Sequence, residues 1–174
     1  MLFRSHELYE PLAEDDGMTL VVKVESAPIH GNRELISQAL ANLVENAIKY
    51  GKPAIAAQPL SASTIAGADR RDVLIEARRE GDRVLLSVTD RGPGIPVADR
   101  KHAVERFVRL EASRTQPGSG LGLSLASAVA TLHGGDLRLD DAHPGLTATL
   151  AIPALSGGSD RLAAQTQDVS QKAA

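Results

Sequence analysis

The spacing of apolar residues changes several times along the chain, and each change predicts a different element. The strongest predicted helix covers residues 33–50, with no Gly or Pro between a plausible cap at Asn32 and a stop at Gly51. Its apolar residues recur at helical spacing and are Leu35, Ile36, Leu40, Leu43, Val44, Ala47 and Ile48.

A second helix is predicted within residues 121–135, and a weaker one near residues 98–106. A short helix over residues 6–17 should be interrupted by Pro11 and stopped at Gly17. In the second helix one apolar stripe holds Leu121, Leu125, Ala128 and Leu132.

Five segments have the composition of strands: 18–26, 72–80, 83–90, 136–141 and 146–153. Gly81-Asp82 is well placed to turn the second and third into a hairpin, and the last two resemble a closing hairpin. This order of elements predicts an α+β fold, a two-layer sandwich with helices on one face of a mixed or antiparallel sheet.

The length of 174 residues suits one domain, which we place at residues 18–153 behind an N-terminal segment, residues 1–17. Residues 52–70 are small, polar and interrupted by proline, which indicates a surface insertion. Residues 154–174 are rich in Ser, Gly, Gln and Ala, so we expect a disordered tail.

Composition narrows the function classes. The formal charge of −3 gives no electrostatic reason to expect nucleic acid or an anionic membrane as partner. Without cysteine, disulfides and thiolate metal sites are excluded. No apolar run reaches the roughly 18 residues of a membrane span and no signal peptide is recognisable, so we expect a cytoplasmic chain.

Four polar residues of the strongest helix fall within about a third of its circumference, opposite the apolar stripe. They are Asn42, Glu45, Asn46 and Lys49. Asparagine is a poor helix former, but its amide oxygen is a good ligand for Mg²⁺, and a lysine one turn on can meet a phosphate. The same pattern also suits a solvated outer face, and the helix alone leaves both open.

Two glycine-rich segments offer further candidate chemistry. Asp90 stands at a strand end before Gly92 and Gly94, where a carboxylate can accept a hydrogen bond from an exocyclic amine such as that of adenine. A tight turn explains the same residues. The second segment, Gly118, Gly120 and Gly122, enters a helix whose free N–H groups suit a phosphate, although it matches neither a Walker loop nor a dinucleotide fingerprint.

Taken together and in order, "NLVENAIKYG", "DRGPGIP", "VERFVRLEASR" and "GSGLGLSLA" resemble the N, G1, F and G2 boxes of the ATP-binding domain of sensor histidine kinases. That domain belongs to the superfamily of gyrase, Hsp90, histidine kinases and MutL. The resemblance covers about residues 8–153. It implies a Bergerat-type sandwich in which ATP lies between the long helix and a mobile lid, here roughly residues 97–119.

The resemblance also implies roles for residues. Asn46 would hold Mg²⁺, with Asn42 beside it near the phosphates, and Asp90 would read the adenine amine. The other expected nucleotide-binding residues are Lys49, Tyr50, Gly92, Gly94, Arg109, Arg114, Gly118, Gly120, Leu121 and Gly122, with Phe107 as the anchor of the lid. Glu45 would assist phosphoryl transfer, with Asn42 as the second candidate catalytic residue.

One position distinguishes branches of the superfamily. Gyrase-like ATPases carry a water-activating glutamate where this chain has Asn42, which cannot act as a general base. The resemblance therefore favours a kinase, whose nucleophile is a histidine on another domain.

His6, in "SHELYEPL", resembles a phosphoacceptor. However, the helical hairpin that carries such a histidine needs about 50–60 residues before the ATP-binding domain begins. Only 36 positions separate His6 from Asn42. We therefore expect that His6 is not the acceptor, and the other histidines have no motif around them.

The expected function is that of a histidine protein kinase catalytic domain. It would transfer the γ-phosphoryl group of Mg-ATP to a histidine on a separate or missing dimerisation domain, in a two-component pathway with a response regulator. Two alternatives remain: an anti-sigma-factor-type serine kinase, and a regulatory nucleotide-binding module without catalysis.

Overall fold

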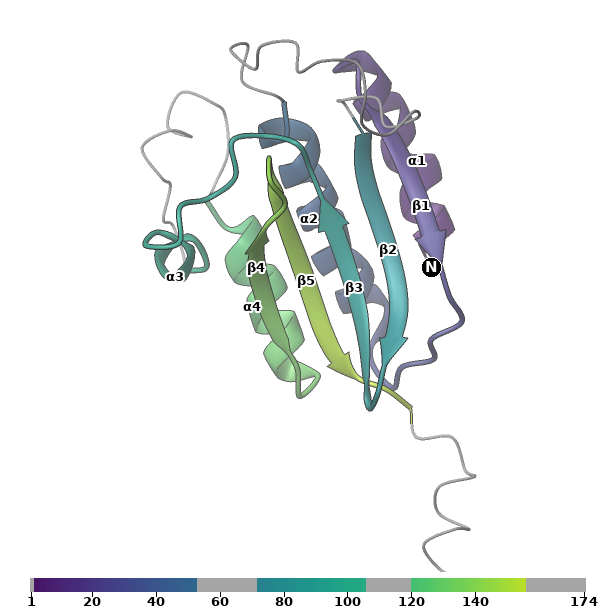
Figure 1. The fold of residues 1–174 in the computed structure, drawn as a ribbon. Helices are drawn as coiled ribbons and strands as arrows, with labels where there is room; N and C mark the ends of the chain where they lie inside the picture. Colours follow the sequence, from purple (N-terminus) through teal and green to yellow (C-terminus); the bar gives the residue numbers. More distant parts are fainter. Residues whose placement is uncertain (1, 53–71, 106–119, 156–174) are drawn as a thin grey trace, which may run out of the picture.

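A computed structural model describes residues 2–52, 72–105 and 120–155. Within them a five-stranded sheet has the order β1-β2-β3-β5-β4 (Figure 1). β1 runs parallel to β2, and every other neighbouring pair is antiparallel. The strands are β1 (Thr19–Val24), β2 (Asp72–Glu80), β3 (Arg83–Thr89), β4 (Asp136–Asp141) and β5 (Leu146–Pro153).

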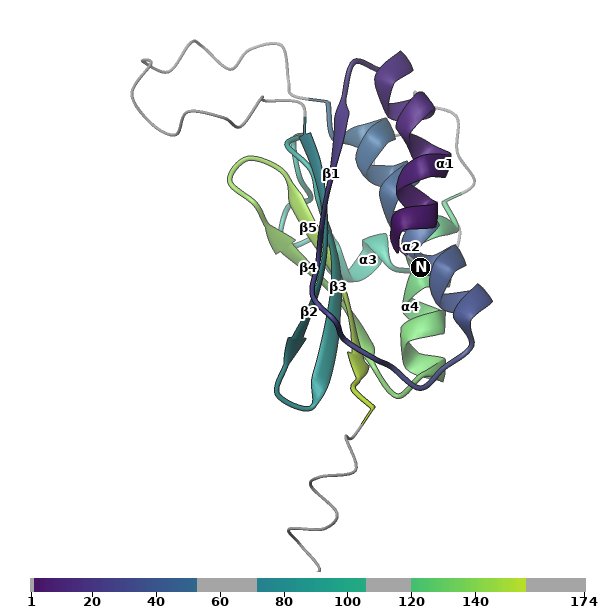
Figure 2. The same cartoon turned by 90° about the vertical axis from the view of Figure 1, so that its right-hand side faces the viewer.

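All the larger helices lie on one face of this sheet, as Figure 2 shows. The helices are α1 (Leu2–Asp15), α2 (Arg33–Tyr50), the short α3 (Arg100–Ala103) and α4 (Gly122–Leu132). One apolar core lies between the two layers, and its largest fully buried side chains are Ile36, Leu40, Leu43, Ile48, Ile75, Leu150 and Ile152. The expected α+β sandwich with a mixed sheet is confirmed.

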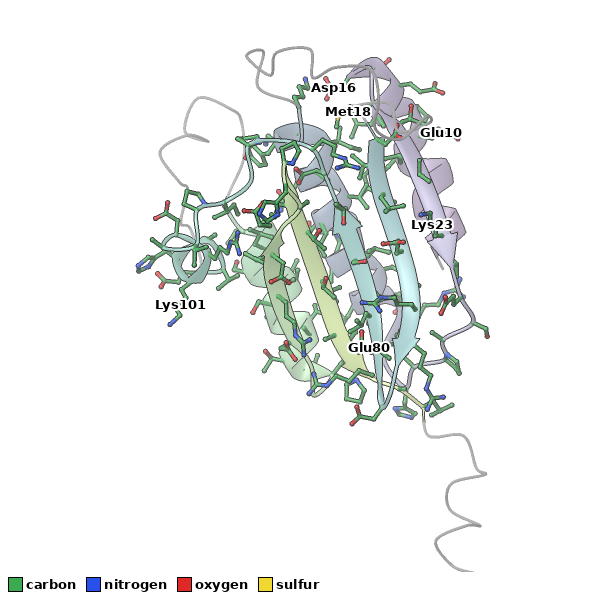
Figure 3. The ribbon with its side chains drawn as sticks, in the orientation of Figure 1. Glu10, Asp16, Met18, Lys23, Glu80 and Lys101 are labelled. Atoms are coloured by element: carbon green, nitrogen blue, oxygen red, sulfur yellow. The ribbon has the colours of Figure 1, made fainter. Side chains whose placement is uncertain are left out.

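The opposite face of the sheet carries polar side chains. In Figure 3, Lys23 lies on β1 and Glu80 at the end of β2. Ion pairs cross this face, including Arg83 to Asp136 at 2.6 Å. This face is exposed and charged, whereas the described residues predicted to bind a ligand lie on α2, after the end of β3 and at the start of α4.

α2 begins and ends where the sequence predicts. The side chain of Asn32 accepts hydrogen bonds from the N–H groups of Glu34 and Leu35, at 2.9 and 3.1 Å, which makes it the N-cap. Gly51 follows the last helical residue. Except for the exposed Leu35 in the first turn, the apolar stripe is buried against the core, so the orientation of α2 about its axis follows from the sequence.

The expectation that Pro11 interrupts the first helix is wrong, because α1 continues through it. A proline inside a helix removes one hydrogen bond and its ring crowds the carbonyl one turn back, but the packing of the buried Ala13 and part-buried Tyr9 against the core keeps the chain helical. The predicted stop at Gly17 is confirmed: its φ is +68°, and the N–H of Met18 reaches back to the carbonyl of Ala13 at 2.8 Å.

α4 buries small side chains rather than its leucines. Ser124, Ala126, Val129 and Ala130 are buried, whereas Leu121, Leu125 and Leu132 are exposed. Small residues allow α4 to pack closely beside α2. The leucines of the stripe seen in the sequence are exposed, while Leu123, outside that stripe, packs against the core.

A histidine links the start of α2 to the end of α4. His133, at the C-terminus of α4, accepts a hydrogen bond on Nε2 from the N–H of Asn32 at 3.0 Å. Its Nδ1 lies 2.7 Å from the carbonyl oxygen of Val129, to which it donates. This side chain therefore fixes the start of α2 against the end of α4.

In the part of the chain that the structure describes, no helix has both the length and the apolar character to cross a membrane.

Candidate functional site

Asp90 lies directly after β3, where that strand ends beside the C-terminus of α2 (Figure 1). It is 7% exposed, and its Oδ1 accepts hydrogen bonds from the N–H of Gly92 at 2.8 Å and of Leu146 at 3.3 Å. Among the described residues both bonds reach this one oxygen, so Oδ2 is free to accept from a ligand. The carboxylate is thus oriented by backbone from two separate loops.

Burial raises the pKa of Asp90 above its usual range, while the N–H groups of Gly92 and Leu146 act in the opposite direction. The net effect is a raised pKa, because two backbone donors do not fully replace the lost water. A further donor on the second oxygen would stabilise the charged form, which an exocyclic amine supplies.

Glycines let three backbone segments meet around Asp90. A Cβ on Gly92 would overlap the carbonyl oxygen of Tyr50, and one on Gly145 would overlap the carbonyl oxygen of Asp90 itself. At Gly51 a Cβ would lie 2.6 Å from the Cβ of Asp90. The glycines of this region are therefore required for packing between protein segments, and the predicted close approach of Gly92 and Gly94 to a ligand stays a prediction.

The other end of the site lies where α2 faces the start of α4. A Cβ on Gly122 would lie 3.1 Å from Nδ2 of Asn46 and 3.7 Å from the Cβ of Asn42. The structure thus brings together three residues that the sequence predicts to share a phosphate and metal site. Gly120, with φ +69°, and Leu121 precede the first turn of α4.

Asn42 has an unusual environment. Its Nδ2 is buried, and it is the one such side-chain atom without a hydrogen-bond partner among the described residues. An amide N–H left buried and unpaired costs about 1–3 kcal/mol, so this position is unfavourable for the protein alone. A phosphate oxygen is the kind of acceptor that would complete it, and the Asn46 amide oxygen suits Mg²⁺.

The remaining polar residues of α2 point elsewhere. The hydroxyl of Tyr9 on α1 donates a hydrogen bond to Oε1 of Glu45 at 2.7 Å, and Nζ of Lys49 lies 5.5 Å from the ring centroid of Tyr50. Burial, followed by the hydrogen bond and charge of Glu45, raises the pKa of Tyr9 to about 12. The structure therefore places Glu45 against α1 and not with the Asn42–Asn46–Gly122 cluster.

Some predicted residues lie outside the described part of the chain. They are Phe107, Arg109, Arg114 and Gly118, together with most of the expected lid and insertion.

Sequence reasoning missed two neighbours of Asp90, Gly145 and Leu146. Gly145 belongs to a stretch that reads only as a hairpin turn. Leu146 contributes through its backbone N–H, which no side-chain pattern reveals.

Comparison with known families agrees with this geometry. A family model described as "Histidine kinase-, DNA gyrase B-, and HSP90-like ATPase" matches residues 31–156, which carry α2, Asp90 and α4. Because this match covers well over half of the chain, the chain belongs to that family.

Relatives within the family are sensor kinases. The chain is 36% identical over 126 residues to the signal transduction histidine-protein kinase/phosphatase MprB of Mycolicibacterium vanbaalenii. It is 35% identical over 128 residues to the protein of that name in Mycobacterium tuberculosis. The matches cover 72% and 71% of this chain but only 23% and 22% of the relatives. The chain thus corresponds to one part of those longer proteins.

Solved structures show the same relationship. The mycobacterial sensor histidine kinase MprB superimposes with a TM-score of 0.67 at 29% identity, over 87% of this chain and 90% of that one. Full-length ShkA in complex with AMPPNP gives 0.69 at 26% identity, over 90% of this chain and 30% of that one. The fold and sequence are those of an ATP-binding catalytic domain of the histidine kinase type.

Proposed function

We propose that this chain binds Mg-ATP with its base at Asp90 and its phosphates at Asn42, Asn46 and the start of α4. It would then present the γ-phosphoryl group to a histidine on another domain. The observation that carries the proposal is the presence of two incompletely bonded polar groups on neighbouring elements. The buried Asp90 carboxylate has hydrogen bonds to only one of its oxygens, and the buried Asn42 amide nitrogen has no partner among the described residues. The carboxylate needs a donor, which the adenine amine supplies, and the amide nitrogen needs an acceptor, which a phosphate oxygen supplies.

Asp90 would accept a hydrogen bond on Oδ2 from the adenine amine. The N–H groups at Gly120, Leu121 and Gly122, at the positive end of α4, would face the phosphates. Lys49, Tyr50, Gly94, Arg109, Arg114 and Gly118 complete the proposed nucleotide-binding set.

Asn46 is the residue we propose as the protein ligand of Mg²⁺. No group of three His, Asp or Glu side chains that could hold a metal occurs in residues 2–52, 72–105 and 120–155. A single amide suits Mg²⁺ shared with a nucleotide, since this ion keeps most of its shell as water and phosphate oxygens. When bound it would neutralise charge on the phosphates.

The chemistry asked of this chain is positioning. Phosphoryl transfer has a loose transition state, so orientation and electrostatic stabilisation carry most of the catalysis. Asn42 would donate to a phosphate oxygen, and because it cannot accept a proton it would not activate water. This supports transfer to a protein side chain over hydrolysis.

Glu45 keeps its proposed part in phosphoryl transfer only if its carboxylate leaves Tyr9. The hydrogen bond to Tyr9 orients it toward α1. Movement of α1 is therefore the event that we propose would release it.

The proposed partners are those that the resemblance to sensor histidine kinases implies. The phosphoacceptor would be a histidine-bearing dimerisation domain, and the next protein a response regulator. We propose a cytoplasmic location. A serine kinase of the anti-sigma-factor type and a non-catalytic regulatory module stay as alternatives, without an observation here that favours either.

The test is calorimetric titration with ATP, with and without Mg²⁺, of the wild type and of Asp90→Asn. The matched control is Asp82→Asn, in the exposed turn between β2 and β3. We expect Mg²⁺-dependent binding that falls in Asp90→Asn and persists in the control. Absence of binding by the folded wild type would contradict the proposal.

Catalysis is tested by adding a helical-hairpin dimerisation domain from a sensor kinase and labelled ATP. Acid-labile phosphohistidine on the added domain is the expected product. Acid-stable phosphoserine would favour the serine kinase alternative, and binding without transfer would favour the regulatory module.

A further inference from the structure

Arg100, at the start of the short helix α3, joins three segments of the chain. Its Nε donates to the carbonyl oxygen of Ile95 at 3.0 Å, and its Nη1 donates to that of Leu139 at 3.2 Å. Its Nη2 lies 3.8 Å from Oδ2 of Asp141. The Arg100 side chain is only 18% exposed, whereas that of Asp141 is 49% exposed, so the two bonds to carbonyl groups are the better-shielded contacts.

The two carbonyl groups belong to very different places. Ile95 closes the loop that begins at Asp90, whereas Leu139 lies on β4, the edge strand of the sheet. The edge strand leaves alternate backbone groups unpaired, and Arg100 satisfies one of them. The guanidinium thus fixes the loop to the sheet edge.

A continuous path leads from this edge back to Asp90. Asp141 ends β4 and accepts a hydrogen bond from the N–H of His143 at 3.0 Å. The turn that follows brings Gly145 against the carbonyl of Asp90. The carbonyl of Leu146 accepts a hydrogen bond from the N–H of Asp90 at 3.0 Å, and the N–H of Leu146 donates to Oδ1 of Asp90 at 3.3 Å. Both loops that orient the Asp90 carboxylate are therefore attached to Arg100.

We propose that Arg100 is a positioning residue for base recognition, holding Asp90 at the angle from which it distinguishes adenine from guanine. This proposal rests on the proposed ATP site. Adenine offers a donor to the carboxylate where guanine offers an acceptor, so a fixed carboxylate favours ATP over GTP. A carboxylate free to turn away would lose both the attraction and the repulsion.

Arginine suits this position better than lysine. Its planar fork directs separate N–H groups at Ile95 and Leu139 at once, while a lysine ammonium could satisfy one of them well. The substitution Arg100→Lys should therefore have an effect intermediate between wild type and Arg100→Ala.

The test is the ratio of ATP to GTP affinity, measured by calorimetry on the full chain. In Arg100→Ala we expect ATP affinity to fall about tenfold and GTP affinity to stay unchanged or rise, so the ratio of ATP to GTP affinity falls at least about tenfold. Arg138→Ala is the matched control, because Arg138 lies on the same strand, β4, and pairs with Asp136 at 2.7 Å away from this loop. General loss of structure would lower both affinities together and leave the ratio unchanged.

If Arg100→Ala does not fold, Arg100→Lys gives the same measurement, with an expected ratio between the two extremes. An unchanged ratio in a folded Arg100 variant would overturn the inference.

Amide hydrogen exchange separates this inference from the proposed function, because it needs no nucleotide. The N–H groups of Gly92 and Leu146 should exchange at least about tenfold faster in Arg100→Ala than in Arg138→Ala. Unchanged exchange overturns the inference even if the wild type binds ATP. If exchange is faster in Arg100→Ala but the wild type binds no nucleotide, Arg100 still anchors the loop and the proposed ATP site is refuted.

Discussion

The two ends of the site differ in how completely the protein satisfies them. At Asp90, which we propose as the base end, backbone N–H groups from two loops reach one carboxylate oxygen, and glycines bring three segments into close contact. At Asn42, the phosphate end, a buried amide nitrogen has no partner among the described residues. Backbone contacts within the protein hold the base end in place, whereas the phosphate end has a buried polar group that only a ligand would satisfy.

Because of this difference, the stability of the protein should respond differently to substitutions at the two ends. A close-packed, hydrogen-bonded region loses stability when it is altered, since each change disturbs backbone contacts. A region with an unsatisfied polar group can gain stability when that group is removed, while it loses its ligand. Substitutions that disturb the packing around Asp90 should therefore destabilise the fold, removal of the Asn42 amide should stabilise it, and both should weaken nucleotide binding.

The largest effect is expected for Gly145→Ala, which attacks the base end. Its φ is +115°, and the added methyl group would overlap the carbonyl oxygen of Asp90. We expect a loss of about 3 kcal/mol or more in the free energy of unfolding, measured by urea denaturation. Gly81→Ala is the control: its φ is +61° and its methyl group meets open space, so it should lose only about 1 kcal/mol. Equal losses would mean that packing at Asp90 adds nothing.

Next in size is the loss of ATP binding in Asp90→Asn, by about 10- to 100-fold. The substitution replaces the charged acceptor Oδ2 by an NH2 group, which cannot accept a hydrogen bond from the adenine amine. Calorimetry measures this loss. Oδ1 still accepts from the two backbone donors, so the fold should persist.

Stability as a function of pH sharpens the same comparison. Because burial raises the pKa of Asp90, the native state holds this proton more tightly than the unfolded chain. Its contribution to stability is full below the pKa of the unfolded carboxyl and falls as pH rises through the raised pKa of the folded state. Asp90→Asn removes this fall, so the variant should gain on the wild type between acid and neutral pH. A constant difference across that range would contradict the assignment.

At the phosphate end, Asn42→Ala should raise the free energy of unfolding by about 1 kcal/mol while it weakens ATP binding. It removes an unpaired buried amide and improves helix propensity. Ser37→Ala on the same helix is the control and should gain at most about 0.5 kcal/mol, from propensity alone. A destabilised Asn42→Ala chain would show that the amide is paired in solution.

The smallest effect is expected for Tyr9→Phe, which tests whether Glu45 belongs to the phosphate end at all. Removing an exposed hydrogen bond should lower stability by less than about 1 kcal/mol. Because the pKa of Tyr9 is raised from 10.0 to about 12, its contribution is present below pH 10 and lost as pH rises through about 12. The absorbance change of tyrosinate near pH 12 should disappear in the variant. If it persists there, the hydroxyl of Tyr9 is not held by Glu45.

The sequence predicts the elements well where a pattern is local. The cap at Asn32, the stop at Gly51 and the hairpin at Gly81-Asp82 are confirmed, because each depends on neighbouring residues alone. The continuity of α1 through Pro11 was not predictable, since it depends on packing against α2 and β1.

For the site, the sequence predicts the meeting of Asn42 and Asn46 with Gly122, which follows from helix periodicity and the resemblance. It does not predict the surroundings of Asp90. Gly145, Leu146 and Arg100 make contacts that involve backbone groups at sequence separations of 5 to 56 residues, and residue type carries no sign of such contacts.

The hydrogen bond from Asn32 to His133 lies at the opposite end of α2 and α4 from Asn46 and Gly122. A hydrogen bond thus joins the two helices at the end opposite the Asn42–Asn46–Gly122 cluster. α4 has 11 residues, which at 1.5 Å each makes a lever about 16 Å long. A rotation of about 5° around His133 would carry Gly122 about 1.4 Å, half the length of a hydrogen bond. His133, at the other end of the helix pair from Gly122, would be the pivot of such a rotation.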